Sequence, residues 1–338
     1  LPALAIPTTL QESLIARLDR LNTVKTIAQI GACIGRELSH ELVSTVSPLS
    51  ETELGSAFRQ LVDAQIILPQ GGASHGSYTF KHALLQDAAY DSLLKGPKRQ
   101  FHDLIAEGLK TKFPDVVANT PELLASHLSK AERFPEAIDH WKDAGLQATR
   151  ASSNREATHH FQSALNFLGK EASTPSKDKR ELELQVPLAL AMAALYGYAS
   201  PKTGHAYERA FALTRSVESP PELFQIMYGL STTRWMGDKF IDGLAIAKEL
   251  AAYSETAKDK DGYVIAHRTY GGAVVWLPDY EMSKTSLQKA IVAYDQRNAH
   301  KFIEEYGSDP KAISLVMLGV THAYSGFPEQ AESFVDEA

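Results

Sequence analysis

Residues 141–165 constrain the fold most, because small side chains recur there at positions that would face each other in a pair of helices. The stretch reads WKDAGLQATRASSNREATHHFQSAL. Its first half has Trp141, Ala144, Gly145 and Ala148, and its second half has Ala157, Phe161 and Ala164. Small residues let two helices approach closely, and large ones fill the remaining gaps. The stretch therefore predicts two antiparallel helices in close contact.

Weaker versions of this pattern follow along the chain. They contain Ala191, Ala194, Tyr207 and Ala210; Leu230, Ser231, Gly243, Ala247 and Leu250; Tyr270, Gly271, Ser283, Leu287 and Ala290; and Leu318, Gly319 and Ala331. The first helices are expected to start near residues 138, 184, 224, 264 and 312, which is a longer spacing than the 34 residues of the tetratricopeptide template. We therefore predict a superhelix of lengthened tetratricopeptide-like repeats over residues 119–338, with the last repeat incomplete.

The first 80 residues carry a different pattern. Leucines and an isoleucine within residues 10–21 lie on one helical face, a second helix is expected over 23–34, and Ser50 with Glu53 forms a capping box that opens a third helix. QIILPQ and SYTF then indicate two strands joined by GGASHG. Three helices followed by a β-hairpin is the order of a winged helix. The predicted fold is thus mainly α, with a winged-helix domain at 1–80, connecting helices at 81–118 and the repeats after them.

Lys81 and His82 stand where the predicted second strand passes into the next helix, in SYTFKHALLQDAAYDSLL. A lysine beside a histidine could serve as a catalytic pair. No nucleophile or acid stands nearby at a spacing that would complete such a site. We interpret the block as a mechanical joint between the hairpin and the repeats.

Charge argues against a nucleic-acid partner. The formal net charge is −7, and the helix that would read DNA in a winged helix, SETELGSAFRQLVDA, has three acidic residues against Arg59. Phosphates would repel such a helix. A DNA-binding transcription regulator with a repeat sensor stays as the alternative function.

The candidate binding residues lie on the predicted first helices, which line the concave wall of a tetratricopeptide array. They are Tyr196, Tyr228, Trp235, Arg268, Trp276 and Tyr324. Aromatic rings with an arginine suit a protein or peptide, or a small ligand such as a sugar or a planar molecule, through stacking and cation–π contacts. The alternative is that the lengthened repeats bury these rings between helices.

No sequence pattern for catalysis, a metal or a cofactor was found. The glycines near Cys33 and near Lys110 do not form a phosphate-binding loop, the adjacent His159 and His160 point in different directions on a helix, and no cysteine pair could hold zinc. Cys33 stands in an apolar helix, where a small core residue is the expected role. We therefore expect no catalytic residue, no metal site and no cofactor, and an enzyme is the least favoured class.

The setting expected for the chain is cytoplasmic. The longest apolar runs are too short to span a membrane, no secretory signal opens the sequence, and one cysteine cannot form an internal disulfide. The sequence starts at Leu1 and ends within a helical pattern, so we expect a piece of a longer protein.

Several segments together resemble a known bacterial architecture. These are IPTTLQESLIARLDRL, IGREL, FKHALLQDAAYDSLL, RQFHDLIAEGL, PELLASHLSKAERFPEAIDHWKDAGLQATRASSNREATHHFQSAL and YGSDPKAISLVMLGVTHAYSGFPEQA. They are similar to the region after the ATPase domain in multidomain adenylate/guanylate cyclase-type signalling proteins of class III. In that family a cyclase domain precedes a signal-transduction AAA-like NTPase, a winged helix and tetratricopeptide-like repeats. Related maltose-regulator-type ATPases sense ligands or partners with an equivalent superhelix.

The resemblance implies a non-catalytic regulatory region. It would bind a protein or a small ligand on the repeats and relay that event to the NTPase and cyclase of its parent chain. The family's catalytic residues cannot be carried over, because neither the phosphate-binding loop nor the metal-binding aspartates of a cyclase are recognisable here.

Overall fold

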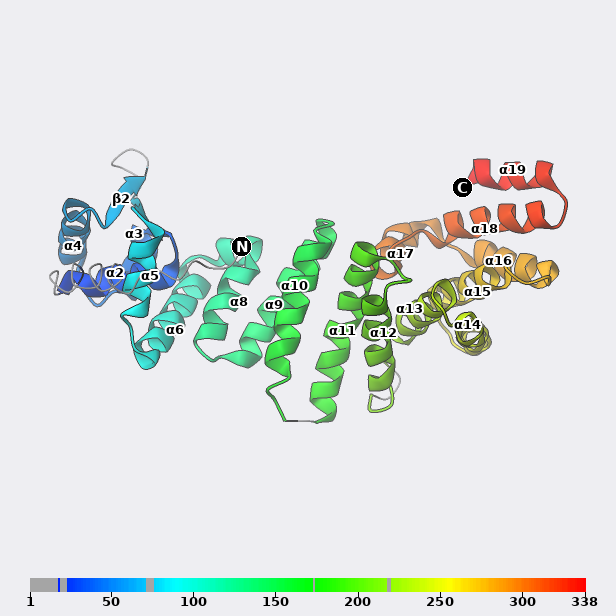
Figure 1. Cartoon of the computed structure of the whole chain (residues 1–338), viewed down its shortest axis with the longest axis horizontal. Coiled ribbons are helices and arrows are strands. Elements are labelled where there is room, and N and C mark those ends of the chain that lie inside the picture. Colours follow the sequence, from blue (N-terminus) through cyan, green and yellow to red (C-terminus); the bar gives the residue numbers. More distant parts are fainter. Residues whose placement is uncertain (1–17, 19–22, 71–75, 173, 218–219) are drawn as a thin grey trace. The chain divides into compact units, whose positions relative to one another are not determined.

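The computed structural model describes residues 18, 23–70, 76–172, 174–217 and 220–338. It divides into two compact units, Leu1–Trp141 (unit 1) and Lys142–Ala338 (unit 2). Figure 1 shows helices in both units and strands in unit 1 alone among the residues described. The predicted mainly α fold is therefore confirmed. The domain boundaries predicted at residues 80 and 118 differ from this division and stay predictions.

Unit 1 begins with a small mixed arrangement of helices and strands. In chain order these are α2 (Thr23–Ile34), β1 (Glu37–Ser39), α3 (His40–Val46), α4 (Glu51–Asp63), β2 (Ile67–Gln70) and β3 (Ser77–Phe80). β3 lies in the middle of the sheet and pairs antiparallel with both neighbours, with Leu38 opposite Tyr78 and Ile67 opposite Phe80. The predicted helix at residues 10–21 falls outside the described residues, except for the buried Leu18.

The structure adds two elements to those predicted for this part of the chain. The sequence analysis expected α2, α4 and the hairpin of β2 and β3, and the capping box of Ser50 and Glu53 is present at the start of α4. It did not predict β1 or α3. β1 has three residues, and they are a strand because they pair with residues 77–79 of β3. Such a distant partner leaves no local pattern in the sequence.

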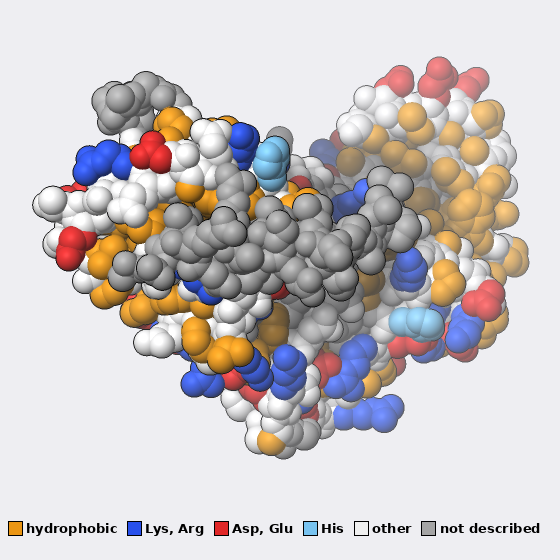
Figure 2. All heavy atoms as spheres, turned by 60° about the vertical axis from the view of Figure 1, so that its left-hand side comes forward, with side chains coloured by type: hydrophobic (Ala, Val, Ile, Leu, Met, Phe, Trp, Pro, Cys, Tyr) orange, Lys and Arg blue, Asp and Glu red, His pale blue; other side chains and the backbone are white. Residues whose placement is uncertain are grey.

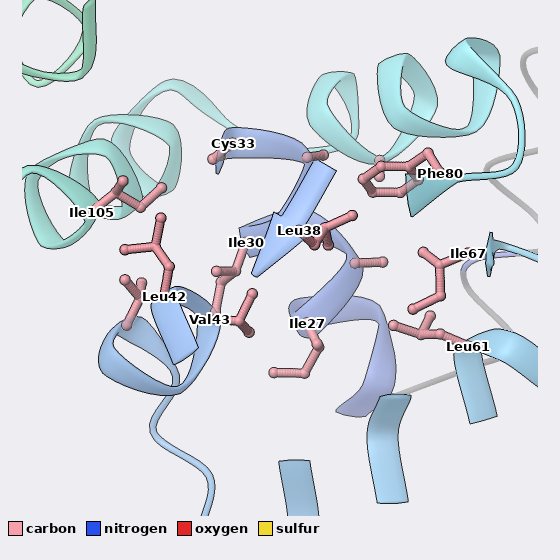
Figure 3. Close-up of a cluster of buried hydrophobic side chains, with 14 of the residues drawn as sticks. Ile27, Ile30, Cys33, Leu38, Leu42, Val43, Leu61, Ile67, Phe80 and Ile105 are labelled. Atoms are coloured by element: carbon pink, nitrogen blue, oxygen red, sulfur yellow. The ribbon is translucent and has the colours of Figure 1, made fainter. Parts of the chain in front are cut away.

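A single apolar core joins these elements. Ile27 and Ile30 of α2, Leu38 of β1 and Phe80 of β3 are almost completely buried and belong to one cluster (Figure 3). Gly31 lies so close to the Leu38 side chain that a Cβ atom there would overlap it. The short strand β1 is therefore held by both its hydrogen bonds and the packing of Leu38.

Helices complete unit 1. They are α5 (Ala83–Asp91), α6 (Lys95–Lys112), α7 (Pro114–Asn119) and α8 (Pro121–Lys130), and α9 (Phe134–Arg150) contains the boundary to unit 2. α5 packs against α2, and α6 packs against α3 and α8. The core of the strands and α2 thus continues through α5 and α6 to Leu124 and Leu128 of α8.

Unit 2 is built of antiparallel helices in consecutive pairs. After α9 follow α10 (Asn154–Leu168), α11 (Pro175–Tyr196), α12 (Pro201–Leu213), α13 (Leu223–Met236), α14 (Phe240–Ser254), α15 (Lys260–Val274), α16 (Tyr280–Ala293), α18 (Pro310–Tyr324) and α19 (Pro328–Glu337). From α12 onward, each second helix packs against both its own partner and the first helix of the next pair, except the last helix. The first helices α11, α13, α15 and α18 also contact one another in sequence. This gives two layers, with the first helices in one and the second helices in the other.

One element interrupts the pairs. A short 3-10 helix, η1 (Gln296–Asn298), and α17 (Ala299–Tyr306) stand between α16 and α18. α17 ends at Gly307, whose left-handed backbone conformation closes the helix. The sequence analysis did not predict α17. The spacing of Phe302 and Tyr306 and the glycine after them are the signals that could have indicated it.

The helix pairs depend on glycines that face large side chains. A Cβ atom at Gly229 of α13 would overlap the ring of Tyr207 on α12, and one at Gly145 would overlap Phe161. Both rings are almost fully buried and cannot move into solvent. In contrast, Gly204 of α12 has open space where a side chain would stand.

Gly229→Ala should destabilise the protein, because the added methyl group forces the buried Tyr207 ring to move. The expected cost is about 1–3 kcal/mol of the free energy of unfolding. Gly204→Ala should instead stabilise its helix by roughly 0.5–1 kcal/mol, since alanine is the better helix former. Urea unfolding followed by circular dichroism measures both variants. Equal effects of the two substitutions would contradict the packing described here.

Candidate functional site

The six predicted binding residues lie on or just after four first helices. Tyr196 ends α11, Tyr228 and Trp235 are on α13, Arg268 is on α15, Trp276 follows α15, and Tyr324 ends α18. The structure brings four of them together in two pairs. The Arg268 guanidinium lies 5.1 Å from the centre of the Tyr228 ring, and the ring centres of Trp276 and Tyr324 are 6.2 Å apart. The predicted single surface is therefore divided into two places.

The first place is an inner aromatic cluster around Tyr228. This side chain is 2% exposed, and the rings of Tyr198 and Tyr306 meet it edge-on at 5.9 and 5.5 Å. Burial raises the pKa of the Tyr207 and Tyr306 hydroxyls well above the ordinary range. Tyr228 therefore has the packing role that the sequence analysis kept as the alternative to ligand binding.

Helix α17 covers the first helices at this cluster. Phe302 and Tyr306 are buried in one core with Tyr228 and with residues of α15. The Tyr198 hydroxyl donates a hydrogen bond to the Tyr306 carbonyl at 3.5 Å, which ties the end of α11 to α17. Around Tyr228, the wall predicted to face a ligand is thus occupied by a segment of the chain itself.

Polar contacts hold the other end of this segment. The Asp261 carboxylate of α15 accepts hydrogen bonds from Lys301 Nζ at 2.8 Å and from Asn298 Nδ2 at 2.9 Å. Asp261 and Lys301 also line a hollow of about 350 Å³, with Glu222, Asp259 and Glu305 among its other walls. Burial is the main cause that raises the pKa of Glu305. Among the described residues, no group of three or more His, Cys, Asp or Glu side chains could hold a metal ion.

The second place is a row of exposed apolar side chains at one edge of unit 2. Two of them flank the turn within each of the last three helix pairs: Met236 and Ile241, Trp276 and Met282, and Tyr324 and Phe327. We call these six residues the edge row. Each is between 42% and 71% exposed. The turn between α9 and α10, by comparison, consists of Ala151, Ser152 and Ser153.

The edge row lies on one side of the array because all three turns connect a first helix to its own second helix. Tyr324 and Phe327 line an open hollow of about 390 Å³ together with Tyr280 and Lys284. The Lys284 ammonium is 5.6 Å from the centre of the Phe327 ring. Figure 2 shows hydrophobic side chains gathered on the fainter part of the molecule, which belongs to unit 2, below several acidic ones. Within the edge row, Trp276 adjoins Tyr324, and Tyr324 and Phe327 line the same hollow; adjoining exposed apolar side chains are typical of interaction sites.

The remaining two predicted residues, Tyr196 and Trp235, belong neither to the inner aromatic cluster nor to the edge row. Tyr196 is half exposed at the end of α11, and the Lys202 ammonium lies 4.6 Å from its ring centre. Trp235 is partly buried next to Gly243, whose backbone approaches it closely, and its indole nitrogen is buried. Sequence reasoning selected neither Met236, Ile241, Met282 nor Phe327. Their shared position beside the turns was the signal that could have identified them.

Lys81 and His82 form the short link between β3 and α5 in unit 1. The Lys81 ammonium donates a hydrogen bond to Gln65 Oε1 at 2.6 Å, just before β2. His82 is the residue before the first turn of α5 and is exposed. The link is therefore tied to the hairpin, and the helix α5 begins without a loop.

Beyond this link, a chain of hydrogen bonds, partly buried at Tyr90 and buried between two histidines, connects three helices. Tyr90 of α5 bonds through its hydroxyl to His102 Nε2 of α6 at 3.1 Å, and His102 Nδ1 lies 2.9 Å from His127 Nδ1 of α8. In the last contact one Nδ1 must donate and the other accept, so the accepting ring must be neutral and the two rings cannot both be protonated. Burial lowers the pKa of His102 to about 3 and that of His127 to about 4, with Lys130 and, at His102, His127 and Lys98 adding to the effect.

Comparisons with known proteins give structural neighbours alone. Neither the protein-family models nor the curated proteins contain a match to the sequence. The crystal structure of BtubC from P. vanneervenii is similar over 72% of this chain and 89% of that chain, with a TM-score of 0.43 and 14% identity. A Signal Transduction ATPase with Numerous Domains with a tetratricopeptide repeat sensor, from Pyrococcus horikoshii, is similar over 93% of this chain and 49% of that chain, with a TM-score of 0.40 and 12% identity. This chain thus spans about half the length of that ATPase, and likenesses at these scores carry no functional argument.

In the described parts of the chain, no helix has the length and apolar character needed to cross a membrane.

Acidification should destabilise unit 1 through the buried histidines. Both rings stay neutral in the folded protein down to about pH 4, whereas in the unfolded chain they bind protons below about pH 6.5. The stability they contribute is therefore complete above pH 6.5 and is lost as the pH falls toward 4, by on the order of 2 kcal/mol per histidine at pH 5.

The measurement is urea unfolding at pH 7, 6 and 5, followed by the fluorescence of Trp141 with Trp235→Phe and Trp276→Phe as the background. The double variant His102→Gln/His127→Gln should lose less stability between pH 7 and 5 than its parent. An identical pH dependence in both proteins would contradict the assignment.

Phe302→Ala should release α17 from the inner cluster, because this ring is the most buried side chain of the helix. If the helix stayed docked, the cavity left by the ring would cost about 3–5 kcal/mol. This is more than the remaining contacts of so short a helix contribute, so we expect the helix to detach. Hydrogen exchange and limited proteolysis at residues 299–306 measure the release. Ile303→Ala is the matched control, since Ile303 is 52% exposed on the same helix and its loss should change little. Equal responses would contradict the docking of α17.

Proposed function

We propose that this chain is a non-catalytic regulatory region that binds a protein partner on unit 2. In this proposal, binding is relayed through unit 1 to an NTPase and a cyclase in the same polypeptide. The observation that carries the proposal is the edge row, in which three consecutive turns each keep two large apolar side chains in solvent. A soluble protein rarely leaves such a group uncovered unless a partner covers it.

The helix pairs support the assignment of unit 2 to tetratricopeptide-like repeats. Their first helices begin at Phe134, Pro175, Leu223, Lys260 and Pro310, and each second helix packs as such a repeat requires. Repeats of this kind form extended surfaces, because each unit needs only its neighbours for stability and further units lengthen the array. This is the property expected of a sensor for a protein partner.

The element order of unit 1 supports a winged helix. A helix, a strand, two helices and a hairpin are present, and the last strand lies between the other two. The exposed face of α4, the helix before the hairpin, carries Glu51, Glu53 and Asp63 against Arg59. Since phosphates would be repelled by that face, protein docking is the favoured role for it and DNA reading is the alternative.

A mechanical route for the relay runs through the buried hydrogen bonds of unit 1. α8 is joined to α6 and α5 by His127, His102 and Tyr90, and α5 follows β3 with a two-residue link. A displacement of α8 would therefore move α5 and the hairpin as one body. The hairpin is the part proposed to dock on the nucleotide-hydrolysing domain.

Deletion of residues 142–338 from the full polypeptide should change its rate of nucleotide hydrolysis by roughly fivefold or more, the scale of typical allosteric coupling. The rate is measured with purified full-length and shortened proteins at equal concentration. The relay would be contradicted if the full-length and shortened proteins hydrolysed nucleotide at identical rates, both in the presence and in the absence of a partner-containing extract. A mobility shift of mixed-sequence duplex DNA at low salt, removed by Arg59→Ala, would instead support the DNA-binding alternative.

A further inference from the structure

We infer that the edge row binds a basic amphipathic segment of the partner, one that presents lysines or arginines beside large apolar side chains. This inference rests on the proposed function, since it names the chemistry of the partner for the same surface. Two properties of the row carry it: the exposed rings and the sign of the charge around them.

The exposed rings provide the apolar half of the site. Trp276 and Tyr324 come from consecutive helix pairs, and their ring centres are 6.2 Å apart at an angle of 60°. Phe327 and Tyr324 border the open hollow beside them. A partner's leucine or phenylalanine could enter this hollow, and the half-exposed ring faces could receive a lysine or arginine through cation–π contact. Lys284 over the Phe327 ring is an example of that contact within the chain itself.

The charge around the row is negative. Exposed carboxylates stand at all three turns: Asp238 and Asp242, Asp279 and Glu281, and Glu329. The cations near them are Lys239, Arg234 and Lys284. Two of these already have acidic neighbours, since Lys284 is 3.1 Å from Glu281 and Arg234 is 3.7 Å from Asp242 and 3.7 Å from Glu208. Five carboxylates against three cations leave the turns with an excess of negative charge for a partner to neutralise.

The same charge disfavours two other occupants. A second copy of this chain would bring an identical acidic rim against the first, and the formal net charge of −7 adds to the repulsion. A membrane surface with anionic lipids would likewise be repelled. A basic segment is the occupant that satisfies both the rings and the carboxylates.

The inference is tested by isothermal titration of the full chain with a synthetic helical peptide of leucines and lysines, arranged with one apolar and one basic face. A matched peptide has glutamate in place of each lysine. We expect one binding event with the lysine peptide, weaker at high salt, and none with the glutamate peptide. Trp276→Ala and Tyr324→Ala should each weaken binding by about tenfold or more, as central aromatic residues of an interface do. The pair Asp238→Asn/Glu329→Gln should weaken it at low salt and much less at high salt.

Val292→Ala is the matched control for the apolar variants. Val292 is 86% exposed near the end of α16 that is far from its turn with α15, so its loss should leave binding unchanged. All variants are first checked for an unaltered melting temperature by circular dichroism. Tyr324→Phe, which keeps the ring, should bind like the unmodified chain and separates loss of the ring from loss of the fold.

Three results would overturn the inference. They are the absence of binding by the lysine peptide, binding that Trp276→Ala and Val292→Ala leave equally strong, and self-association of the chain in sedimentation that Trp276→Ala removes. Failure of the proposed function is distinguishable, because it is read from nucleotide hydrolysis after deletion of unit 2. A deletion that changes hydrolysis while the peptide fails to bind would reject the basic partner and keep the regulatory role.

Discussion

Contacts between a glycine on one helix and a large ring on a neighbouring helix set the geometry of unit 2. At Gly229 and Tyr207, at Gly145 and Phe161, and again at Gly262 and Phe224, the absence of a side chain is what gives a buried ring its space. The helices approach closely there, and the resulting angle between pairs fixes where each turn lies. The edge row is a consequence, since turns of successive pairs are stacked along one edge only if the pairs repeat the same packing.

The sequence allowed the helices of both units to be predicted because their signals are local. A capping box at Ser50 and small residues at fixed spacing in residues 141–165 need no information from elsewhere in the chain. β1 lacked such signals, and α17 had only the spacing of Phe302 and Tyr306 and the glycine after them. β1 exists through its pairing with β3, and α17 is held by Tyr198 and Asp261, which are far from it in sequence. The periodicity of a segment cannot predict an element that is held in place by residues far away in the sequence.

The candidate site was likewise predictable from the sequence only in part. The sequence analysis selected aromatic residues of the first helices, but it could not distinguish Tyr228, which α17 covers, from Trp276, which stays exposed. The difference comes from the position of an inserted helix and not from the residues themselves. Met236, Ile241, Met282 and Phe327 are ordinary apolar residues in the sequence, and they become a surface because three turns lie at one edge.

Helix α17 has a consequence for how unit 2 gains and loses its structure. A chain of repeats in which each unit touches only its neighbours can unfold piecewise from either end. The Tyr198–Tyr306 hydrogen bond spans 108 residues, and the core shared by α13, α15 and α17 closes the same long loop. If any one of α13, α15 and α17 separates, the buried faces of the other two become exposed. The middle of unit 2 is thus expected to open as one cooperative block, and α18 extends it, because Leu318 shares a core with Val275 and Leu287.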